Sequence, residues 1–471
     1  MGANRKAKQM NIVIVGAGKV GKTIAKKLTY EGHDVVIIDN NADVLSRSSN
    51  EMDAICIDGN GSDYRVQRDA GVSTADILIA ATAHDEVNML CCLIAHKLGA
   101  KRTIARVRDP IYSAQMDYLK EELGLSLSIN PELAAAEEIS RLLRIPSALN
   151  AEVFAQGKVE LIGIRLDKDN PLCDMILNDI YKRLKIKLLV CAVQRGSECF
   201  IPNGDFMFQA GDKIHITAPP EELAKFLRTT MPEKKRKVKA IMICGGGRIA
   251  YYLTKMLEKL GTQVKIVETN PQRAAFLSEE FPHALVIHGD NTDHDMLLEE
   301  GIDSTDAFIA LTGMDETNII TGLSAKWQGA SSVIVKVNNE DLIGALPDNA
   351  LDAIISPKQI TANKILAFVR AMSCSPEESN VETVHELLGG RIEALEFIAR
   401  GSHPMYGVPL KKLGKYLRKD LLIACIVRHG KAIIPGGEEF IRTGDRVIIV
   451  TKQKMFNDLA DILTGPVPQT I

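Results

Sequence analysis

This 471-residue chain lacks paired cysteines: it has nine, an odd number, and no C-x-x-C motif. Disulfide frameworks and structural zinc sites normally need such pairs, so we expect neither. A reducing compartment follows, and we predict a cytoplasmic protein. The apolar runs, such as Leu421–Val427, are far shorter than the roughly 20 residues that span a bilayer, so any work at a membrane would need a partner.

The chain also lacks an excess of charge of one sign. It has 57 Lys and Arg against 60 Asp and Glu, a formal net charge of −3. We therefore predict no nucleic-acid partner. Hydrophobic residues make up 46% and charged residues 25%, as in ordinary globular proteins, and the length suggests three or four domains. The one dense basic run, residues 231–239, is interpreted as a solvated linker.

The two halves of the chain repeat each other. The segment IVIVGAGKVGKTIAKKLTYEGHDVVIIDNN aligns with IMICGGGRIAYYLTKMLEKLGTQVKIVETN. Three pairs of segments align in this way, and they begin at Ile12 and Ile241, at Ala75 and Thr305, and at Leu188 and Leu421. Each half therefore consists of a larger unit followed by a smaller one.

The larger unit alternates short apolar runs with amphipathic stretches. In the first half the runs lie at 13–15, 35–38, 54–57, 77–81 and 104–107, with helices expected around 19–31, 86–98 and 112–123. This alternation predicts an open, parallel, doubly wound sheet. The smaller unit has short strands around turn signals, typical of a small α+β domain. The predicted fold class is α/β, with two Rossmann-like domains each followed by a small α+β domain, at residues 11–130, 150–230, 239–357 and 381–465.

A dinucleotide fingerprint opens the first half. The motif G-x-G-x-x-G begins at Gly16, between an apolar run and a helix, and Asp39 ends the next strand. Gly16 allows the tight turn, and Gly18 lets the backbone approach a pyrophosphate at the positive end of the helix. Asp39 can accept hydrogen bonds from ribose and repels a 2′-phosphate, so NAD(H) or an adenine nucleotide is favoured over NADP(H).

The second half carries a variant of the same fingerprint. Its glycines are Gly245, Gly246 and Gly247, and Ala250 takes the third glycine position, with Glu268 in the place of Asp39. We predict a second nucleotide site here. Arg248 could help to hold a phosphate or could be solvated.

A second cluster lies at the ends of the fourth and fifth strands. Small residues there leave room for a ligand: Thr82 and Ala83 in the first half, Thr312 and Gly313 in the second. Arg106 and Lys336 end the fifth strands, where each could bind a phosphate or form a surface ion pair. Asp85 and Asp315 begin the next helices, and we expect them to complement the helix dipoles.

Catalytic groups are not evident. The small units carry no His–Asp pair, Ser–Tyr–Lys set or cysteine nucleophile, and His215 lies in an apolar run where a core role is expected. The loop with His288 and His294 has no histidine in its first-half counterpart, so no metal site is predicted. Two nucleotide sites without catalytic groups indicate a sensor and not an enzyme.

The duplicated order GAGKVG, Asp39, GNGSD, AATAHDEVNML and IPNGD…AGDKI resembles the TrkA family of Trk potassium-uptake regulators, built from tandem RCK (or KTN) domains. The resemblance covers residues 11–465. It implies a regulatory subunit on the cytoplasmic face of the cell membrane, peripheral to it. Such a subunit forms a homo-oligomeric ring, expected to be a tetramer, and gates an integral-membrane potassium channel or transporter subunit of the Trk type in response to NAD(H) or ATP/ADP.

The family's nucleotide contacts can be carried over residue by residue. They fall on Gly16, Ala17, Gly18, Lys19, Val20, Asp39, Thr82, Ala83 and Arg106, and in the second half on Gly245, Gly246, Gly247, Arg248, Ile249, Glu268, Thr312 and, with less support, Lys336. The departures at Ala250 and Lys336 leave the ligand of the second site open.

Three alternatives remain. The chain could be an NAD-dependent oxidoreductase with duplicated Rossmann domains, a scaffold with vestigial nucleotide sites, or a regulator of a partner unrelated to potassium. In the sensor interpretation, the expected hinges lie near residues 124–150 and 345–385.

Overall fold

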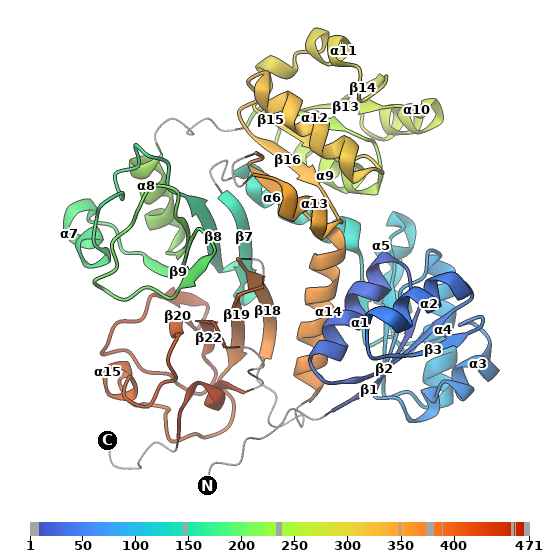
Figure 1. Ribbon diagram of the computed structural model, residues 1–471, viewed down its shortest axis with the longest axis horizontal. Coiled ribbons are helices and arrows are strands. Elements are labelled where there is room, and N and C mark those ends of the chain that lie inside the picture. Colours follow the sequence, from blue (N-terminus) through green and yellow to red (C-terminus); the bar gives the residue numbers. More distant parts are fainter. Residues whose placement is uncertain are drawn as a thin grey trace.

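Four sheets make up the computed structural model, two of them parallel and two antiparallel (Figure 1). Within the described segments, no helix has both the length and the apolar character that crossing a bilayer requires. Residues 232–237 of the expected linker lie outside the described residues. The structure describes residues 9–144, 148–231, 238–347, 350–373, 381–388, 390–453, 456 and 458–465.

The first parallel sheet has the strand order β3-β2-β1-β4-β5-β6, which confirms the doubly wound prediction. Its strands are β1 (Asn11–Val15), β2 (Asp34–Asp39), β3 (Ile55–Asp58), β4 (Ile77–Ala80), β5 (Arg102–Arg106) and β6 (Leu127–Ile129). Its helices are α1 (Lys19–Tyr30), α2 (Ala42–Glu51), α3 (Tyr64–Asp69), α4 (Asp85–Leu98) and α5 (Pro110–Leu119). The order reverses between β1 and β4, so the crevice at their carboxyl ends is where such sheets bind ligands.

The second parallel sheet repeats this order as β14-β13-β12-β15-β16-β17. Its strands are β12 (Ala240–Cys244), β13 (Gln263–Glu268), β14 (Leu285–His288), β15 (Ala307–Ala310), β16 (Val333–Lys336) and β17 (Ala353–Ile355). Its helices are α9 (Arg248–Glu258), α10 (Pro271–Glu280), α11 (His294–Glu299), α12 (Asp315–Trp327) and α13 (Glu340–Ala345).

Each small unit forms a five-stranded antiparallel sheet, as an α+β domain should. The first contains β7 (Ala148–Phe154), β8 (Val159–Arg165), β9 (Leu189–Arg195), β10 (Glu198–Phe200) and β11 (Lys213–Thr217), with α7 (Ile180–Leu184) and α8 (Pro220–Thr230). The second contains β18 (Val381–Leu387), β19 (Ile392–Ile398), β20 (Leu421–Arg428), β21 (Lys431–Ile433) and β22 (Arg446–Thr451), with α15 (Leu410–Leu413). One apolar cluster joins the two sheets, in which Leu161 and Ala192 pack with Ala394 and Val450.

Two long helices cross between the halves: α6 (Pro131–Arg144) follows the first parallel sheet, and α14 (Pro357–Ser373) follows the second. Helix α6 packs against α9 of the second unit, whereas α14 packs against α1 of the first (Figure 1). The buried side chains of Ile365 and Val369 on α14 join the same core as Ile24 and Leu28 on α1. Each parallel unit is thus completed by a helix from the other half.

These crossing helices occupy the segments where hinges were expected. Each segment contains a short parallel strand, β6 or β17, and a helix with a buried apolar face. The three-residue strands are too short to give a periodic signal in the sequence. Within these segments, residues 145–147, 348–349 and 374–380 lie outside the described residues.

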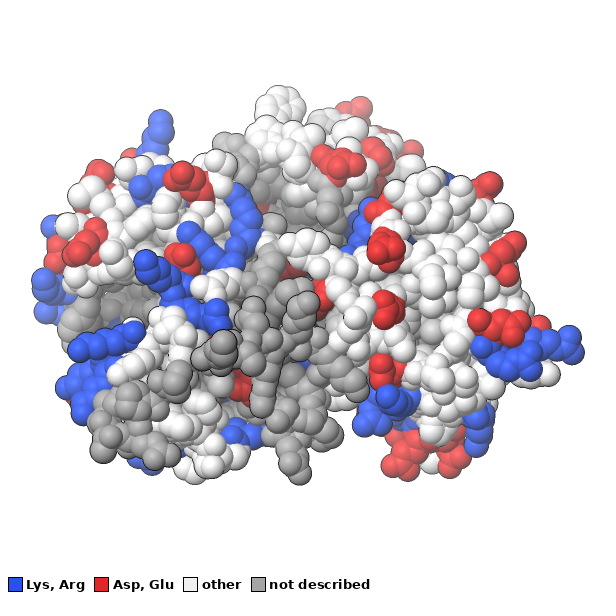
Figure 2. Space-filling model, turned by 60° about the horizontal axis from the view of Figure 1, so that its bottom comes forward, with Lys and Arg blue, Asp and Glu red and all other residues white. Residues whose placement is uncertain are grey.

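The surface shown in Figure 2 carries charged side chains of both signs. Among the described residues on this face, Lys and Arg side chains gather over the antiparallel units at the left, and Asp and Glu side chains prevail over the first parallel unit at the right. The pattern matches the nearly balanced composition of the chain.

An ion pair lies where the edge strands of the two antiparallel sheets meet. His385 Nδ1 on β18 is 2.5 Å from Glu152 Oε2 on β7. Burial disfavours the imidazolium most strongly, but the charge and hydrogen bond of Glu152, together with the charge of Glu138, outweigh burial and raise the pKa of His385. Burial and the neighbouring Glu152 raise the pKa of Glu138 on α6. His215, predicted to have a core role, is buried on β11 nearby.

This ion pair predicts that the protein loses stability as the pH rises above neutral. A histidine whose folded-state pKa is raised stabilises the fold fully below its unfolded pKa of about 6.5, and the contribution disappears as the pH passes through the folded value. His385→Gln should therefore lower the melting temperature by a few degrees at pH 6 and by much less at pH 9. Thermal denaturation of the unaltered protein and the variant from pH 6 to 9 checks this. If the difference between their melting temperatures does not shrink as the pH rises, the prediction is wrong.

Candidate functional site

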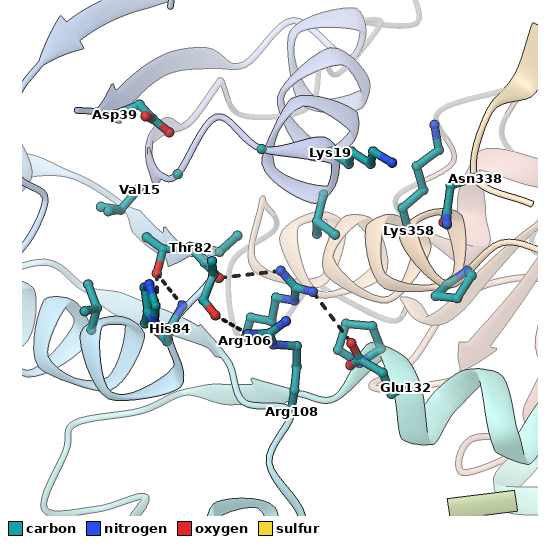
Figure 3. Close-up of a pocket in the computed structure, with 18 of the residues that line it drawn as sticks. Val15, Lys19, Asp39, Thr82, His84, Arg106, Arg108, Glu132, Asn338 and Lys358 are labelled. Carbon is teal, nitrogen blue, oxygen red and sulfur yellow. Dashed lines mark hydrogen bonds and ion pairs between the residues drawn. The ribbon is translucent and has the colours of Figure 1, made fainter. Parts of the chain in front are cut away.

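A cavity of about 950 Å³ lies at the carboxyl ends of β1 and β4 and is lined by both halves of the chain (Figure 3). The first half supplies most of the lining, which includes Asp39, Asn60, the glycine turn and Arg106. The second half contributes its own glycine turn at Gly247 and residues near Lys336. The two fingerprints therefore open into one shared space.

The first glycine turn has the geometry that its sequence predicts. Gly16 has φ +101°, and a Cβ there would lie 3.0 Å from the backbone nitrogen of Thr82. A Cβ on Gly21 would lie 1.9 Å from the carbonyl oxygen of Gly16, so only glycine fits beneath the turn. Gly18 faces open space in the cavity, where a ligand can approach the backbone. In the second half Gly245 has φ +100° and the same close approach to Thr312.

The carboxylate of Asp39 holds the glycine turn as well as facing the cavity. Its Oδ2 accepts a hydrogen bond from the Ala17 N–H at 2.6 Å, and its Oδ1 accepts one from the Asn41 N–H at 2.9 Å. Each carboxylate oxygen has a second lone pair that a ribose hydroxyl can use. Glu268 repeats the arrangement, with 2.6 Å from the Gly246 N–H and 2.8 Å from the Asn270 N–H.

A fully buried asparagine joins the ends of β4 and β5. The Oδ1 of Asn88 accepts hydrogen bonds from the Thr82 N–H at 2.8 Å and from its hydroxyl at 2.7 Å, and its Nδ2 donates to the carbonyl of Arg106 at 2.9 Å. Asn318 makes the equivalent bonds to Thr312 and Lys336. The two asparagines occupy equivalent positions in the repeated segments that begin at Ala75 and Thr305, but sequence alone does not reveal this role.

The acidic residues at the start of α4 and α12 do more than complement helix dipoles. Asp85 Oδ2 accepts hydrogen bonds from the backbone N–H groups of Arg108 and Asp109, both at 2.7 Å. Asp315 holds Asn338 and Asn339 in the same way, at 2.9 Å each. These carboxylates thus fix the loops that follow the fifth strands, a tertiary role that helix position alone could not reveal.

Cations converge on the cavity from both halves (Figure 3). Arg106 is not a surface residue: its side chain is 17% exposed, 3.7 Å from the carboxylate of Glu132. Within the described part of the chain, the buried Nε of Arg106 has no hydrogen-bond partner, and burial lowers its pKa. An anionic acceptor in the cavity would satisfy this atom. The lining cations are Lys19, Arg106, Arg108, Arg248, Lys336 and Lys358.

The comparisons with known proteins agree with this architecture. The TrkA-N domain family matches residues 12–131 and 241–357, and the TrkA-C domain family matches residues 161–230. A Trk system potassium uptake protein TrkA homolog from Archaeoglobus fulgidus is 34% identical, over 96% of this chain and 100% of its own length. The chain belongs to the TrkA family.

Other members and solved structures show the same relationship. The Trk system potassium uptake protein TrkA of Haemophilus influenzae is 31% identical over 94% of this chain and 96% of its own length. The crystal structure of the GsuK RCK domain has a TM-score of 0.60 and 19% identity, covering 94% of this chain and 92% of that one. The GsuK channel bound to NAD has a TM-score of 0.59 and 18% identity, covering 94% and 77%. At these identities the GsuK structures support the fold.

The two glycine turns of this TrkA-family chain contribute unequally to the cavity. Among the described residues that line it, the second half supplies Gly247, Arg248 and Ile249, but Gly245, Gly246, Glu268 and Thr312 do not line it. Arg273 lies over that turn instead, and its Nε donates to the carbonyl of Gly246 at 2.7 Å. Val44 occupies the aligned position in the first half. Of the two predicted sites, the first is therefore the more open.

Asn88→Ala should lower the free energy of unfolding by about 1–3 kcal/mol, because it leaves the Thr82 N–H and the Arg106 carbonyl without their buried partner. Asn318→Ala should cost about the same, since its hydrogen bonds have the same lengths. Thermal denaturation of both variants tests this. The exposed Asn40 provides the control, and Asn40→Ala should change little; equal melting temperatures for all four proteins would contradict the assigned role.

Proposed function

We propose that this chain is the nucleotide-binding regulatory subunit of a potassium uptake system, and that it gates an integral-membrane potassium channel or transporter subunit of the Trk type. The shared cavity is the observation that carries the proposal, because a ligand on the first glycine turn would touch both halves at once. The family relationship supplies the potassium context, since full-length relatives are named Trk system potassium uptake proteins.

The ligand that fits is NAD(H), or alternatively ATP or ADP. The ribose of an adenosine moiety would sit at Asp39, and the phosphates would sit at Gly18 and the start of α1, where the helix dipole and free N–H groups favour anions. Arg106 would donate its unpartnered Nε to a phosphate oxygen. The proposed contacts of the first site are Gly16, Ala17, Gly18, Lys19, Val20, Asp39, Thr82, Ala83 and Arg106.

The second half would act on the same ligand from the opposite wall. Arg248 and Lys336 add positive charge there, so a ligand with more phosphate charge gains more from the presence of both halves. A ligand shifts a conformational equilibrium only by its difference in affinity between two arrangements. Nucleotides that make different contacts with Arg248 and Lys336 would therefore stabilise different arrangements of the halves. The coupling free energy in an ordinary allosteric protein is ~1–3 kcal/mol.

We propose a sensor and not an enzyme. The polar side chains at the cavity ends of β4 and β5 hold backbone: Asn88 fixes Thr82, and Asp85 fixes the loop at Arg108. The lining cations suit phosphate binding, which positions a nucleotide without transferring a hydride. The oxidoreductase alternative would be favoured by turnover of NADH with simple carbonyl substrates.

Assembly into a homo-oligomeric ring, expected to be a tetramer, would place these subunits on the inner face of the membrane. Exposed apolar side chains at the start of α12 and along it offer a contact surface for a second copy: the N-cap Met314, Ile320 and Trp327 are all exposed, the tryptophan by 84%. Ile111 and Tyr118 on α5 are exposed as well. Large apolar side chains grouped on one helix are typical of protein interfaces.

Gly18→Asp should weaken nucleotide binding by about 100-fold or more, because it places a carboxylate against the pyrophosphate and like charges at close range cost several kcal/mol. Calorimetry with NADH, ATP and ADP measures the affinity, and potassium uptake in cells measures the consequence. Gly344→Asp introduces the same side chain on α13, where a Cβ meets nothing within 4 Å, and serves as the control. Normal binding and uptake by the Gly18 variant would rule out the first site as the sensor.

Trp327→Lys should dissociate the ring, since it replaces a large apolar contact with a solvated charge. Light scattering after size-exclusion chromatography should show a tetramer for the unaltered protein and smaller species for the variant. Leu260→Lys, at a position 55% exposed after α9, provides the control and should leave the tetramer intact. If the Trp327 variant remains a tetramer, α12 does not form the contact.

A further inference from the structure

Three charged side chains form a buried cluster away from the cavity. Arg370 donates from Nε to Glu31 Oε1 at 2.8 Å, and its Nη1 and Nη2 each donate to a carboxylate oxygen of Glu393 at 3.0 Å. Arg370 Nη2 also contacts Glu31. The side chains of Arg370, Glu31 and Glu393 are only 4%, 8% and 2% exposed. A two-pronged bond to one carboxylate and a second bond to another fix the guanidinium in one orientation.

The members of this cluster come from three separate units. Glu31 is the C-terminal cap of α1 in the first parallel unit, Arg370 lies on the crossing helix α14, and Glu393 lies on β19 of the second antiparallel sheet. A second contact reinforces the junction one turn earlier on α1. Lys27 Nζ is 2.6 Å from Glu386 Oε2 on β18 and 2.7 Å from Asn363 Oδ1 on α14.

The opposite end of α1 is the first glycine turn. Gly18 is the N-terminal cap of this helix, and Lys19 is its first residue and lines the cavity. Twelve residues of α-helix span roughly 18 Å. The apolar face of α1, with Ile24 and Leu28, packs in one core with α14. A displacement at the phosphate-binding end of α1 therefore reaches Glu31 through a single rigid helix.

The cluster is poorly suited to a purely stabilising role. It holds two carboxylates against one guanidinium, and burial raises the pKa of Glu31 even beside Arg370. Desolvation of such buried charges often cancels their attraction, whereas breaking one contact leaves a buried charge uncompensated. A displacement of Glu31 would therefore break its buried contact with Arg370, unless Arg370 and Glu393 move with it.

The other half has no such cluster among its described residues. Pro131 and Pro357 begin the two crossing helices, so Arg144 takes the place of Arg370, and it is exposed. Leu260, at the position of Glu31, is exposed too. Among the described residues, α1 is the helix after a glycine turn that ends in such a cluster, whereas on the other side the crossing helix α6 carries Glu138 near Glu152 of β7.

We propose that Arg370 is a positioning residue that couples nucleotide occupancy of the first glycine turn to the second antiparallel sheet, through α1 and the pair Glu31 and Glu393. This inference rests on the proposed function, because it needs a ligand at that turn. In this proposal, nucleotide binding at the first glycine turn acts most directly on β18 and β19 of the second antiparallel sheet. The first antiparallel sheet has a less direct connection to that turn.

Amide hydrogen exchange of the full chain, with and without saturating NADH, ATP or ADP, tests the proposal. In the unaltered protein, nucleotide should change exchange in β18 and β19. Glu31→Leu installs the residue of the other half and keeps the Arg370–Glu393 pair. It should reduce that change to less than about a fifth, while calorimetry shows a Kd within about three-fold of the original. Glu31→Gln, which keeps the shape and one acceptor, should be intermediate.

Asp445→Asn is the matched control. Asp445 pairs with Arg428 at 2.8 Å and is also buried, but both residues belong to the second antiparallel unit, Arg428 on β20 and Asp445 just before β22. This variant should lower the melting temperature and retain the nucleotide-dependent change. If the Glu31→Leu variant binds nucleotide and keeps the full change in β18 and β19, the coupling role of Arg370 is wrong. An unaltered protein that binds no nucleotide contradicts the proposed function itself, whereas binding without any change in β18 and β19 contradicts the coupling alone.

Discussion

The exchange of α6 and α14 is the packing constraint on which the rest of the molecule depends. In each parallel unit the first helix packs partly on its own sheet, and the crossing helix of the other half covers the apolar face that this sheet leaves open. Separating the halves would expose both faces, at roughly 25 cal/mol for each Å² of apolar surface. The two glycine turns therefore face a common cavity because the crossing helices hold them there.

Buried polar contacts fix how the crossing helix α14 and the two antiparallel sheets lie relative to one another. On β19, Glu393 binds Arg370 of the crossing helix, and Glu396 accepts a hydrogen bond from the Ala155 N–H of the first antiparallel unit at 2.9 Å. Ala155 has φ +51°, a conformation unfavourable for alanine, and the Glu396 carboxylate helps to hold it. One strand thus joins the crossing helix and both antiparallel sheets through directional bonds, while the apolar clusters supply most of the cohesion.

Duplication has left the halves alike in backbone and unlike in side chains. Both parallel sheets have the same strand order, and Asn88 and Asn318 make the same hydrogen bonds. The first half supplies most of the described residues that line the cavity, and only α1 ends in a buried charge cluster among the described helices of the two parallel units. In a chain that carries both copies, each copy is free to acquire its own role. Under the proposed function, one turn receives the ligand and the other supplies the opposite wall.

The sequence by itself determined the repeat, the two doubly wound sheets and the residues of both glycine turns, because these depend on local periodicity and on glycine's access to positive φ. Asp39 and Arg106 could also be placed, since the ends of parallel strands meet at one edge of the sheet. The tertiary structure alone decided that the two turns share a cavity, that Asn88 and Asp85 hold the loops around it, and that Glu31 meets Arg370 and Glu393. Those contacts join residues up to 339 positions apart, and the crossing of α6 and α14, which no local pattern encodes, brings the two parallel units together.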